Sequence, residues 1–471
     1  MDTQKRIRIF YILSTIGIVI GFATSAIALV SFSASQYGEY NLYMNYIIQL
    51  GVLSFGFQDG MLINYRKREY TNMLPTLKRD LNFGFIFQTV VLIFSIILVP
   101  IFFKTELGSS QFIILILSLI SFFPVTLLGN IRNAFSALGK FDIIGYFDFF
   151  TKLYMLIGII IVSIFHLNII LYMIIDIIFK FVIVGWLYIK IYHDYKKINI
   201  KENNTTSNFS IIDNFKKGLF ILLGNWAYVL VFSLDKTFLQ KNTSFLGIYS
   251  YSLFVLTTLN QLFIPIKSVI VSMINENKKG KEIFKMAAQI TMLVFSVVVL
   301  YLWIGEPLIL YLLEVVGQKI PGIVDKIEAI TQGIELSSII TIGMPFYIVV
   351  HLLFMSLLLV KDQRKFAFYG TINAIITLCI YFICVNTIKS SPLYAVSIAT
   401  VINYLITYLF TGTIVIGIKE GFKLIVFSIF LMIISLFLIQ FDNIFMFIII
   451  TALIIGYFLI LKTTKKKGEV V

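Results

Sequence analysis

Charged residues are scarce in this chain. Only 13% of its 471 residues are Asp, Glu, Lys or Arg, whereas a soluble globular domain contains about 25%. Hydrophobic residues make up 59% of the chain. They form near-continuous runs of about 20 residues, which suit membrane helices, without the alternation of barrel strands. These features exclude a soluble protein and predict an all-α polytopic membrane protein.

Cysteine, histidine and acidic residues are also few. The two cysteines, Cys379 and Cys384, lie in one apolar run and are interpreted as small hydrophobic residues. The three histidines do not cluster. The sequence has no metal-ligand spacing, phosphate-binding glycine loop or Ser/His/Asp arrangement. We therefore expect no enzyme activity, no metal and no cofactor. A coupling ion, H⁺ or Na⁺, is left open.

About fourteen apolar spans are predicted, with both termini in the cytoplasm. The first run is too long for the apolar region of a signal peptide, and we interpret it as a retained helix. The predicted spans are 9–33, 41–63, 82–103, 112–136, 143–164, 168–190, 218–239, 246–272, 284–303, 334–360, 367–387, 392–417, 422–440 and 443–461. The span at 284–303 is expected to continue, with a break, through Glu306 and Pro307.

The basic residues lie mostly on one side of these spans. The net charge of +14 comes from Lys and Arg in the segments assigned to the cytoplasm. Every such segment has at least two basic residues, and no outside segment has more than two. This distribution is the positive-inside pattern of plasma-membrane proteins. It explains the high charge without a nucleic-acid partner.

Two stretches of the chain show similar short signatures at similar positions. Tyr37-Gly38-Glu39-Tyr40 opens the second span, and Leu246-Gly247-Ile248-Tyr249 opens the eighth. Lys140-Phe141 with Gly145 and Lys365-Phe366 with Gly370 precede two later spans in the same way. We interpret these as a parallel repeat of two six-helix bundles. The predicted domains are 1–190, a cytoplasmic linker at 191–217, a second bundle at 218–417, and an extra helix pair with a basic cytoplasmic tail at 418–471.

The order of these motifs resembles a known family. The motifs are Gln36-Tyr37-Gly38-Glu39-Tyr40 after the first span, Asp235-Lys236 at the end of the seventh, and the stretch 391–400, which opens the twelfth. Together they are similar to the polysaccharide flippases (O-antigen, Wzx type) of the multidrug/oligosaccharidyl-lipid/polysaccharide (MOP) transporter superfamily. The resemblance implies a V-shaped, MATE-like bundle. It also implies transport of an undecaprenyl-diphosphate-linked oligosaccharide across the bacterial plasma membrane.

The fifth and sixth spans each contain Asp-x-x-x-Lys within an apolar run. The residues are Asp148 and Lys152 in one span and Asp176 and Lys180 in the other. A spacing of four places carboxylate and ammonium on one helix face. Charges at this depth cost roughly 3 kcal/mol each and usually face a bundle interior or a wet cavity. Two interpretations stay open: self-neutralised structural pairs, or a cationic patch that binds an anionic substrate while the aspartates keep the lysines charged.

Other polar residues in the spans are weaker candidates. Lys267 either contributes to substrate binding or extends to the cytoplasmic headgroups, and headgroup contact is the preferred interpretation for Arg132. Asp235 and Lys236 form a local pair or act in gating or ion coupling, and His351 either packs in the bundle or couples transport to protons. Amides that line a polar cavity or tie helices together are Asn225, Asn260 and Gln261.

Other functions were weighed against the flippase. A cation-coupled multidrug antiporter of the same superfamily depends on unpaired carboxylates deep in the spans, and none is found here. A lipid II flippase is an alternative, weakened by the lack of extra arginines in the first span. A membrane oligosaccharide polymerase is expected to act on the outer side with a sizeable outside loop. It is disfavoured because the longest outside connection is only about 20 residues and carries no obvious catalytic group. The expected partners are membrane lipids, the lipid-linked substrate, a polymerase and other assembly proteins.

Overall fold

The computed structural model describes residues 3–66, 68–103, 108–197, 210–254, 256–257, 280–319, 324–350, 353, 363–389 and 391–417, together with 422, 423, 426 and 430. These residues form helices and short connections and contain no strand. Eight helices in this part are long and apolar enough to cross a membrane, or up to ten if each bent pair is one span. The chain is therefore an all-α multi-pass membrane protein, as predicted. The predicted total of fourteen spans includes segments outside the described residues.

The chain folds as two compact units. The first comprises Met1–Lys236 and Gln240–Gly247, and the second Thr237–Leu239 and Ile248–Val471. The helices described in the first unit are α1 (Thr3–Ser31), α2 (Ala34–Gln49), the 3₁₀ turn η1 (Leu50–Ser54), α3 (Phe57–Tyr65), α4 (Tyr70–Phe103), α5 (Ser109–Ala137), α6 (Phe141–Ile164), α7 (Ile169–Lys197) and α8 (Ile211–Val231). α9 (Leu234–Leu239) begins in the first unit and ends in the second.

The second unit contains the remaining helices that the structure describes. They are α11 (Gly280–Leu300), the π-helical turn η2 (Tyr301–Gly305), α12 (Glu306–Lys319), α13 (Val324–Ile342), α15 (Gln363–Thr387) and α16 (Pro392–Ile416). The candidate span Ala287–Val315 includes η2, so the predicted continuation past Pro307 is confirmed, with a π-helical turn at Tyr301–Gly305 where a break was expected at Glu306 and Pro307. A π-helical turn changes the helix register without leaving the apolar run.

The second predicted span is bent rather than straight. α2 with η1 meets α3 at an angle of 64°. Phe55 and Gly56 at the bend have φ angles of 49° and 77°, a left-handed conformation that stops a right-handed helix. The predicted span over 41–63 therefore consists of a bent pair of helices rather than one continuous helix. The periodic apolar pattern continues through the bend, so it gives no warning of the change in direction.

α8 packs against α3 within the first unit. Gly60 lies against the backbone of Asn214, and Gly218 lies against the backbone of Gly56. These glycines have no Cβ, so the two helices approach at backbone distance. Asn214 also donates to the buried Asp80 carboxylate at 2.9 Å. The packing therefore places α8 in the first unit, although it follows the predicted linker at 191–217. The division of the chain into two sequence repeats stays a prediction.

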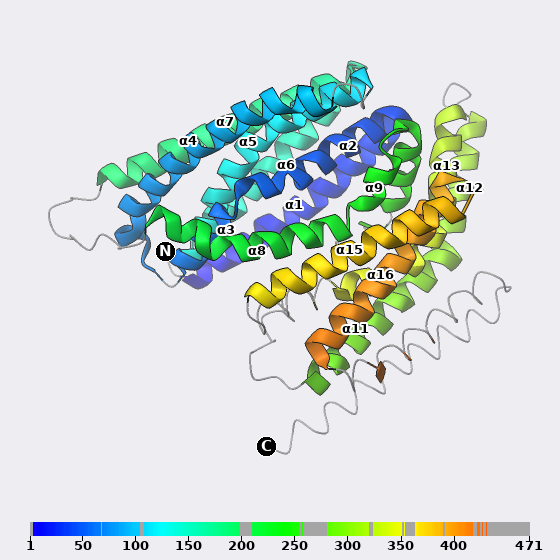
Figure 1. Ribbon diagram of the computed structural model, residues 1–471. Coiled ribbons are helices and arrows are strands. Elements are labelled where there is room, and N and C mark those ends of the chain that lie inside the picture. Colours follow the sequence, from blue (N-terminus) through cyan, green and yellow to red (C-terminus); the bar gives the residue numbers. More distant parts are fainter. Residues whose placement is uncertain are drawn as a thin grey trace. The chain divides into compact units, whose positions relative to one another are not determined.

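Aromatic and aliphatic side chains fill the core of the first unit. α4, α5 and α7 lie side by side (Figure 1), and their buried faces include Leu77, Leu127 and Leu187. α1 packs along α6. Gly145 of α6 faces the Cα of Phe10, which allows close approach of the two helices. This arrangement positions the two Asp-x-x-x-Lys turns, one on α6 and the other on α7.

Candidate functional site

The Asp-x-x-x-Lys turn of α7 is buried and is hydrogen-bonded to side chains of three other helices. The Nζ of Lys180 lies 2.5 Å from Oδ2 of Asp176 and donates to the Ser121 hydroxyl at 3.0 Å. The hydroxyls of Tyr43 and Tyr154 donate to Asp176 at 2.7 and 3.0 Å. Both charged side chains are buried, with Asp176 only 2% exposed. The carboxylate therefore has three donors, from α2, α6 and its own helix.

This network has the properties of a structural tie. A buried ion pair offsets its desolvation cost when the geometry is close and the other polar atoms also find partners. Asp176 joins α2, α6 and α7, and Lys180 adds α5 through Ser121. An incoming anion would have to displace existing partners of Lys180. In this conformation the α7 pair favours the structural interpretation.

The corresponding turn of α6 is arranged differently. Asp148 and Lys152 form no ion pair in the described structure, and Asp148 instead pairs with Arg132 of α5 at 3.0 Å. The expected Asp148–Lys152 pair is therefore wrong as a direct contact. Arg132 comes from the adjacent helix, and its planar guanidinium suits a carboxylate. It binds Asp148 rather than extending alone to the headgroups.

Lys152 extends across α1. Its Cγ and the end of its side chain lie beside Gly17 and Gly21, at ordinary van der Waals distance from where a Cβ would stand. The two glycines leave room for the lysine stem between α1 and α6. Lys152 is exposed and is the twelfth of the 24 residues of α6. An exposed cation thus lies at the middle of a membrane-spanning helix.

We define the α5–α6 cationic site as Arg132, Asp148 and Lys152. Arg132 and Lys152 carry two positive charges, and Asp148 balances one of them. Their donors are compatible with an anionic group such as a phosphate. In the part of the chain that the structure describes, no group of three or more His, Cys, Asp or Glu residues is placed to hold a metal ion.

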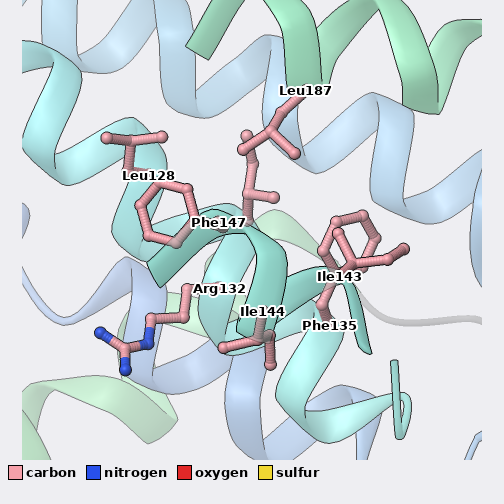
Figure 2. Close-up of a pocket in the computed structure, with 8 residues that line it drawn as sticks. Leu128, Arg132, Phe135, Ile143, Ile144, Phe147 and Leu187 are labelled. Atoms are coloured by element: carbon pink, nitrogen blue, oxygen red, sulfur yellow. The ribbon is translucent and has the colours of Figure 1, made fainter. Parts of the chain in front are cut away.

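A small apolar pocket lies beside this site. Seven apolar side chains and Arg132 line it, and its volume is about 10 Å³, which is room for about one water molecule. Figure 2 shows the Arg132 guanidinium directed away from Phe135 and Ile143. The pocket is too small for a phosphate or a sugar and is best described as a packing void.

The other candidates are dispersed or lie outside the described residues. Asp235 is buried at the start of α9, where its carboxylate accepts a hydrogen bond from the Lys236 backbone N–H at 2.8 Å. Asn225 is exposed on α8. Neither observation tests a role in gating or sugar binding. The candidates outside the described residues are Lys267, His351, Asn260 and Gln261.

Amides in the second unit tie helices together. Thr377 donates to Asn403 Oδ1 at 2.7 Å, and Thr407 donates to Asn373 Oδ1 at 3.3 Å. These bonds link α15 to α16, and all four residues are buried. Interhelical bonds of this kind are common in membrane bundles.

Sequence reasoning missed three partners of the candidate charges. Arg132 is distant in sequence from Asp148, and Tyr43 and Tyr154 are two of many tyrosines in apolar runs. Tyr154 lies on α6 and its partner Asp176 on α7, so no spacing within one helix predicts their hydrogen bond. The rotation of α5 against α6 and of α2 against α7 decides the other contacts.

The fold is that of MOP superfamily transporters. The lipid II flippase MurJ, in an inward closed conformation, matches with a TM-score of 0.65 and 16% identity over 98% of this chain and 99% of that one. A MOP superfamily transporter from Pyrococcus furiosus matches with a TM-score of 0.59 and 12% identity, over 91% of this chain and 97% of its own.

A multidrug resistance MATE family transporter in an outward-facing conformation is also similar. Its TM-score is 0.52 at 14% identity, over 91% of this chain and 97% of that chain. These structures are of transporters and flippases, not enzymes. No family profile and no curated protein matches the sequence. The similarity confirms the predicted fold, and the narrower O-antigen flippase assignment stays a prediction.

Proposed function

We propose that this protein is a flippase for an undecaprenyl-diphosphate-linked oligosaccharide. It moves the repeat unit from the inner to the outer leaflet of the bacterial plasma membrane by alternating access. The product is used for a surface polysaccharide: O-antigen, capsule or exopolysaccharide. The observation that carries the proposal is Lys152, an exposed ammonium without an ion pair in the described structure, at the middle of α6.

The charge of the α5–α6 cationic site fits the diphosphate of this substrate. An unpaired cation in the hydrocarbon region is costly, so such residues face a bundle interior or a wet cavity and mark a substrate pathway. Lys152 supplies a mobile donor, and Arg132 supplies a second cation whose partner, Asp148, can be exchanged for phosphate oxygens. Of the lysines in the two Asp-x-x-x-Lys turns, Lys180 is the weaker candidate because it is buried and already donates to Asp176 and Ser121.

A lipid II flippase is the second candidate. The match to the MurJ structure over 98% of this chain favours it, and a lipid-linked diphosphate would use the same cations. The multidrug antiporter is disfavoured by the excess of positive charge at the α5–α6 cationic site, which would repel a cationic drug. An oligosaccharide polymerase is disfavoured because the similar structures are of transporters.

Depletion of the protein in living cells tests the proposal. We expect undecaprenyl-linked repeat units to accumulate on the cytoplasmic leaflet and to return to the outer leaflet when the unaltered chain is supplied. Lys152→Ala should fail to restore them, whereas Lys216→Ala, which removes an exposed lysine from α8, should succeed. An unchanged leaflet distribution would contradict the flippase, and accumulation of lipid II alone would favour the second candidate.

A further inference from the structure

The C-terminal end of α7 carries aromatic and basic side chains on its surface. Trp186 and Tyr192 are 46% and 47% exposed. The same end of α7 also contains Lys190, Lys196 and Lys197. The distribution of basic residues in the sequence assigns this end to the cytoplasmic side. Tryptophan and tyrosine favour the boundary between hydrocarbon and headgroups. This end of α7 therefore lies where a lipid headgroup would meet it.

Lysine ammonium groups lie over these rings. Lys78 of α4 is 4.2 Å from the ring centre of Tyr195 and 4.9 Å from that of Tyr192. Lys196 lies 4.8 Å from the same Tyr192 ring, on the α7 helix itself. Lys190 is 5.6 Å from the ring of Trp186. Cation–π contacts hold the ammonium groups in place and leave N–H donors available.

The basic-aromatic cluster comprises Lys78, Lys190, Lys196, Trp186, Tyr192 and Tyr195. None of its three lysines forms an ion pair with a carboxylate in the part of the chain that the structure describes. The nearby Asp194 accepts a hydrogen bond from the Tyr70 hydroxyl at 2.9 Å. The three lysines of the cluster therefore carry positive charge that no carboxylate pairs with among the described residues.

Lys140 adds a further cation at the edge of this cluster. Its ammonium lies 4.2 Å from the ring centre of Tyr70. Partial burial lowers the pKa of Lys140, and the nearby charges of Arg6 and Lys190 lower it further, against the opposing effect of Asp142 and Asp194. The basic groups thus repel one another, and a bound anion would relieve that repulsion.

An apolar stripe leads along α7 to these lysines. Ile178, Val182 and Ile189 are 56%, 60% and 70% exposed. Helical periodicity places them and Lys196 on one face of α7. Lys196 is seven residues beyond Ile189, about 10 Å along the axis. Over this length the face changes from apolar to cationic, in the same order in which a phospholipid changes from its acyl chains to its phosphate.

We propose that the basic-aromatic cluster binds the headgroup of an anionic phospholipid, whose acyl chain lies along the exposed apolar stripe of α7. A free phosphate would use only the lysines and would leave the stripe without a role. A zwitterionic lipid would cover the stripe but would bring no net negative charge. This site is distinct from the α5–α6 cationic site and does not depend on the transported substrate.

Trp186 provides a direct reporter for this site. The chain has three tryptophans, so Trp226→Phe with Trp303→Phe leaves Trp186 as the only one. This protein would be reconstituted in bilayers that contain phosphatidylglycerol or phosphatidylcholine with brominated acyl chains, which quench indole fluorescence on contact. We expect phosphatidylglycerol to be preferred about fivefold, as befits lysines at an anionic surface. High salt should reduce this preference.

Charge variants decide the outcome. Lys78→Gln with Lys196→Gln should bring the preference close to one, and Lys196→Gln alone should lower it partly. The matched control, Lys216→Gln with Lys365→Gln, removes two exposed lysines elsewhere and should keep it. Unfolding temperatures verify that each variant is folded. Equal quenching by the two lipids before any lysine is changed, or a preference that survives Lys78→Gln with Lys196→Gln, overturns the proposal.

Discussion

The two Asp-x-x-x-Lys turns share a spacing but not an environment. On α7 the pair is closed, buried and surrounded by hydroxyl donors. On α6 the aspartate is bound by Arg132 of a neighbouring helix, and the lysine extends over two glycines of α1. One local pattern thus produces a buried, hydrogen-bonded ion pair in the first case and, among the described residues, an exposed lysine without an ion pair in the second. The two environments differ in burial and in the partners that neighbouring helices supply.

The largest expected effect is on the buried pair. Lys180→Ala leaves the Asp176 carboxylate buried without its cation, which should cost about 3–5 kcal/mol of stability. Thermal unfolding in nanodiscs measures this. Asp176→Asn with Lys180→Met should recover most of the loss, because the amide oxygen still accepts from one of the two tyrosine hydroxyls and the amide N–H can donate to the other. If Lys180→Ala unfolds at the unaltered temperature, the α7 pair is not a structural tie.

Lys152→Ala should instead impair transport and leave stability almost unchanged. Loss of a charge-assisted hydrogen bond to substrate costs about 1.5–3 kcal/mol, so transport in proteoliposomes should fall tenfold or more. The unfolding temperature should change little, because Lys152 is exposed and has no ion pair to lose. Lys152→Arg keeps the charge and should retain part of the activity. Full transport by Lys152→Ala would remove the α5–α6 cationic site from the mechanism.

Tyr154→Phe tests how much one donor contributes to the buried network. The substitution keeps the ring and removes the hydroxyl that donates to Asp176 at 3.0 Å. We expect a loss of about 1.5 kcal/mol, the lower range for a hydrogen bond to a charged group. Denaturant or thermal unfolding measures it, with Tyr146→Phe on an exposed position of α6 as the control. Equal stability of both variants would mean that Asp176 does not need this donor.

The smallest effect is expected at the glycines beside Lys152. Gly21→Ala adds a methyl group at 3.6 Å or more from the lysine stem. Stability should therefore stay the same or rise by up to about 1 kcal/mol through helix propensity, with transport unchanged. Gly38→Ala is the contrast, because its methyl group would collide with the Thr243 carbonyl. A strong transport defect in folded Gly21→Ala would show that Lys152 needs more room than this structure provides.

The class of protein and the position of most described helices could be predicted from the sequence. Apolar runs, their length and the side on which lysines gather are local properties, and they predict helical spans at 143–164 and 168–190 close to α6 and α7. The continuation of a span past Pro307 was also predictable. The bend at Phe55 and Gly56 was not, because a left-handed backbone leaves no mark on the apolar pattern.

The packing of neighbouring helices determines which of the two lysines is exposed. The contacts of Asp148 with Arg132, and of Asp176 with Tyr43, depend on how far each helix is rotated about its axis against its neighbour. Likewise, α8 joins the first unit because glycines on α3 and α8 let two backbones meet. A spacing of four residues places two charges on one helix face. The neighbouring helices determine whether that face is covered, since burial and ion pairing are properties of the packed bundle.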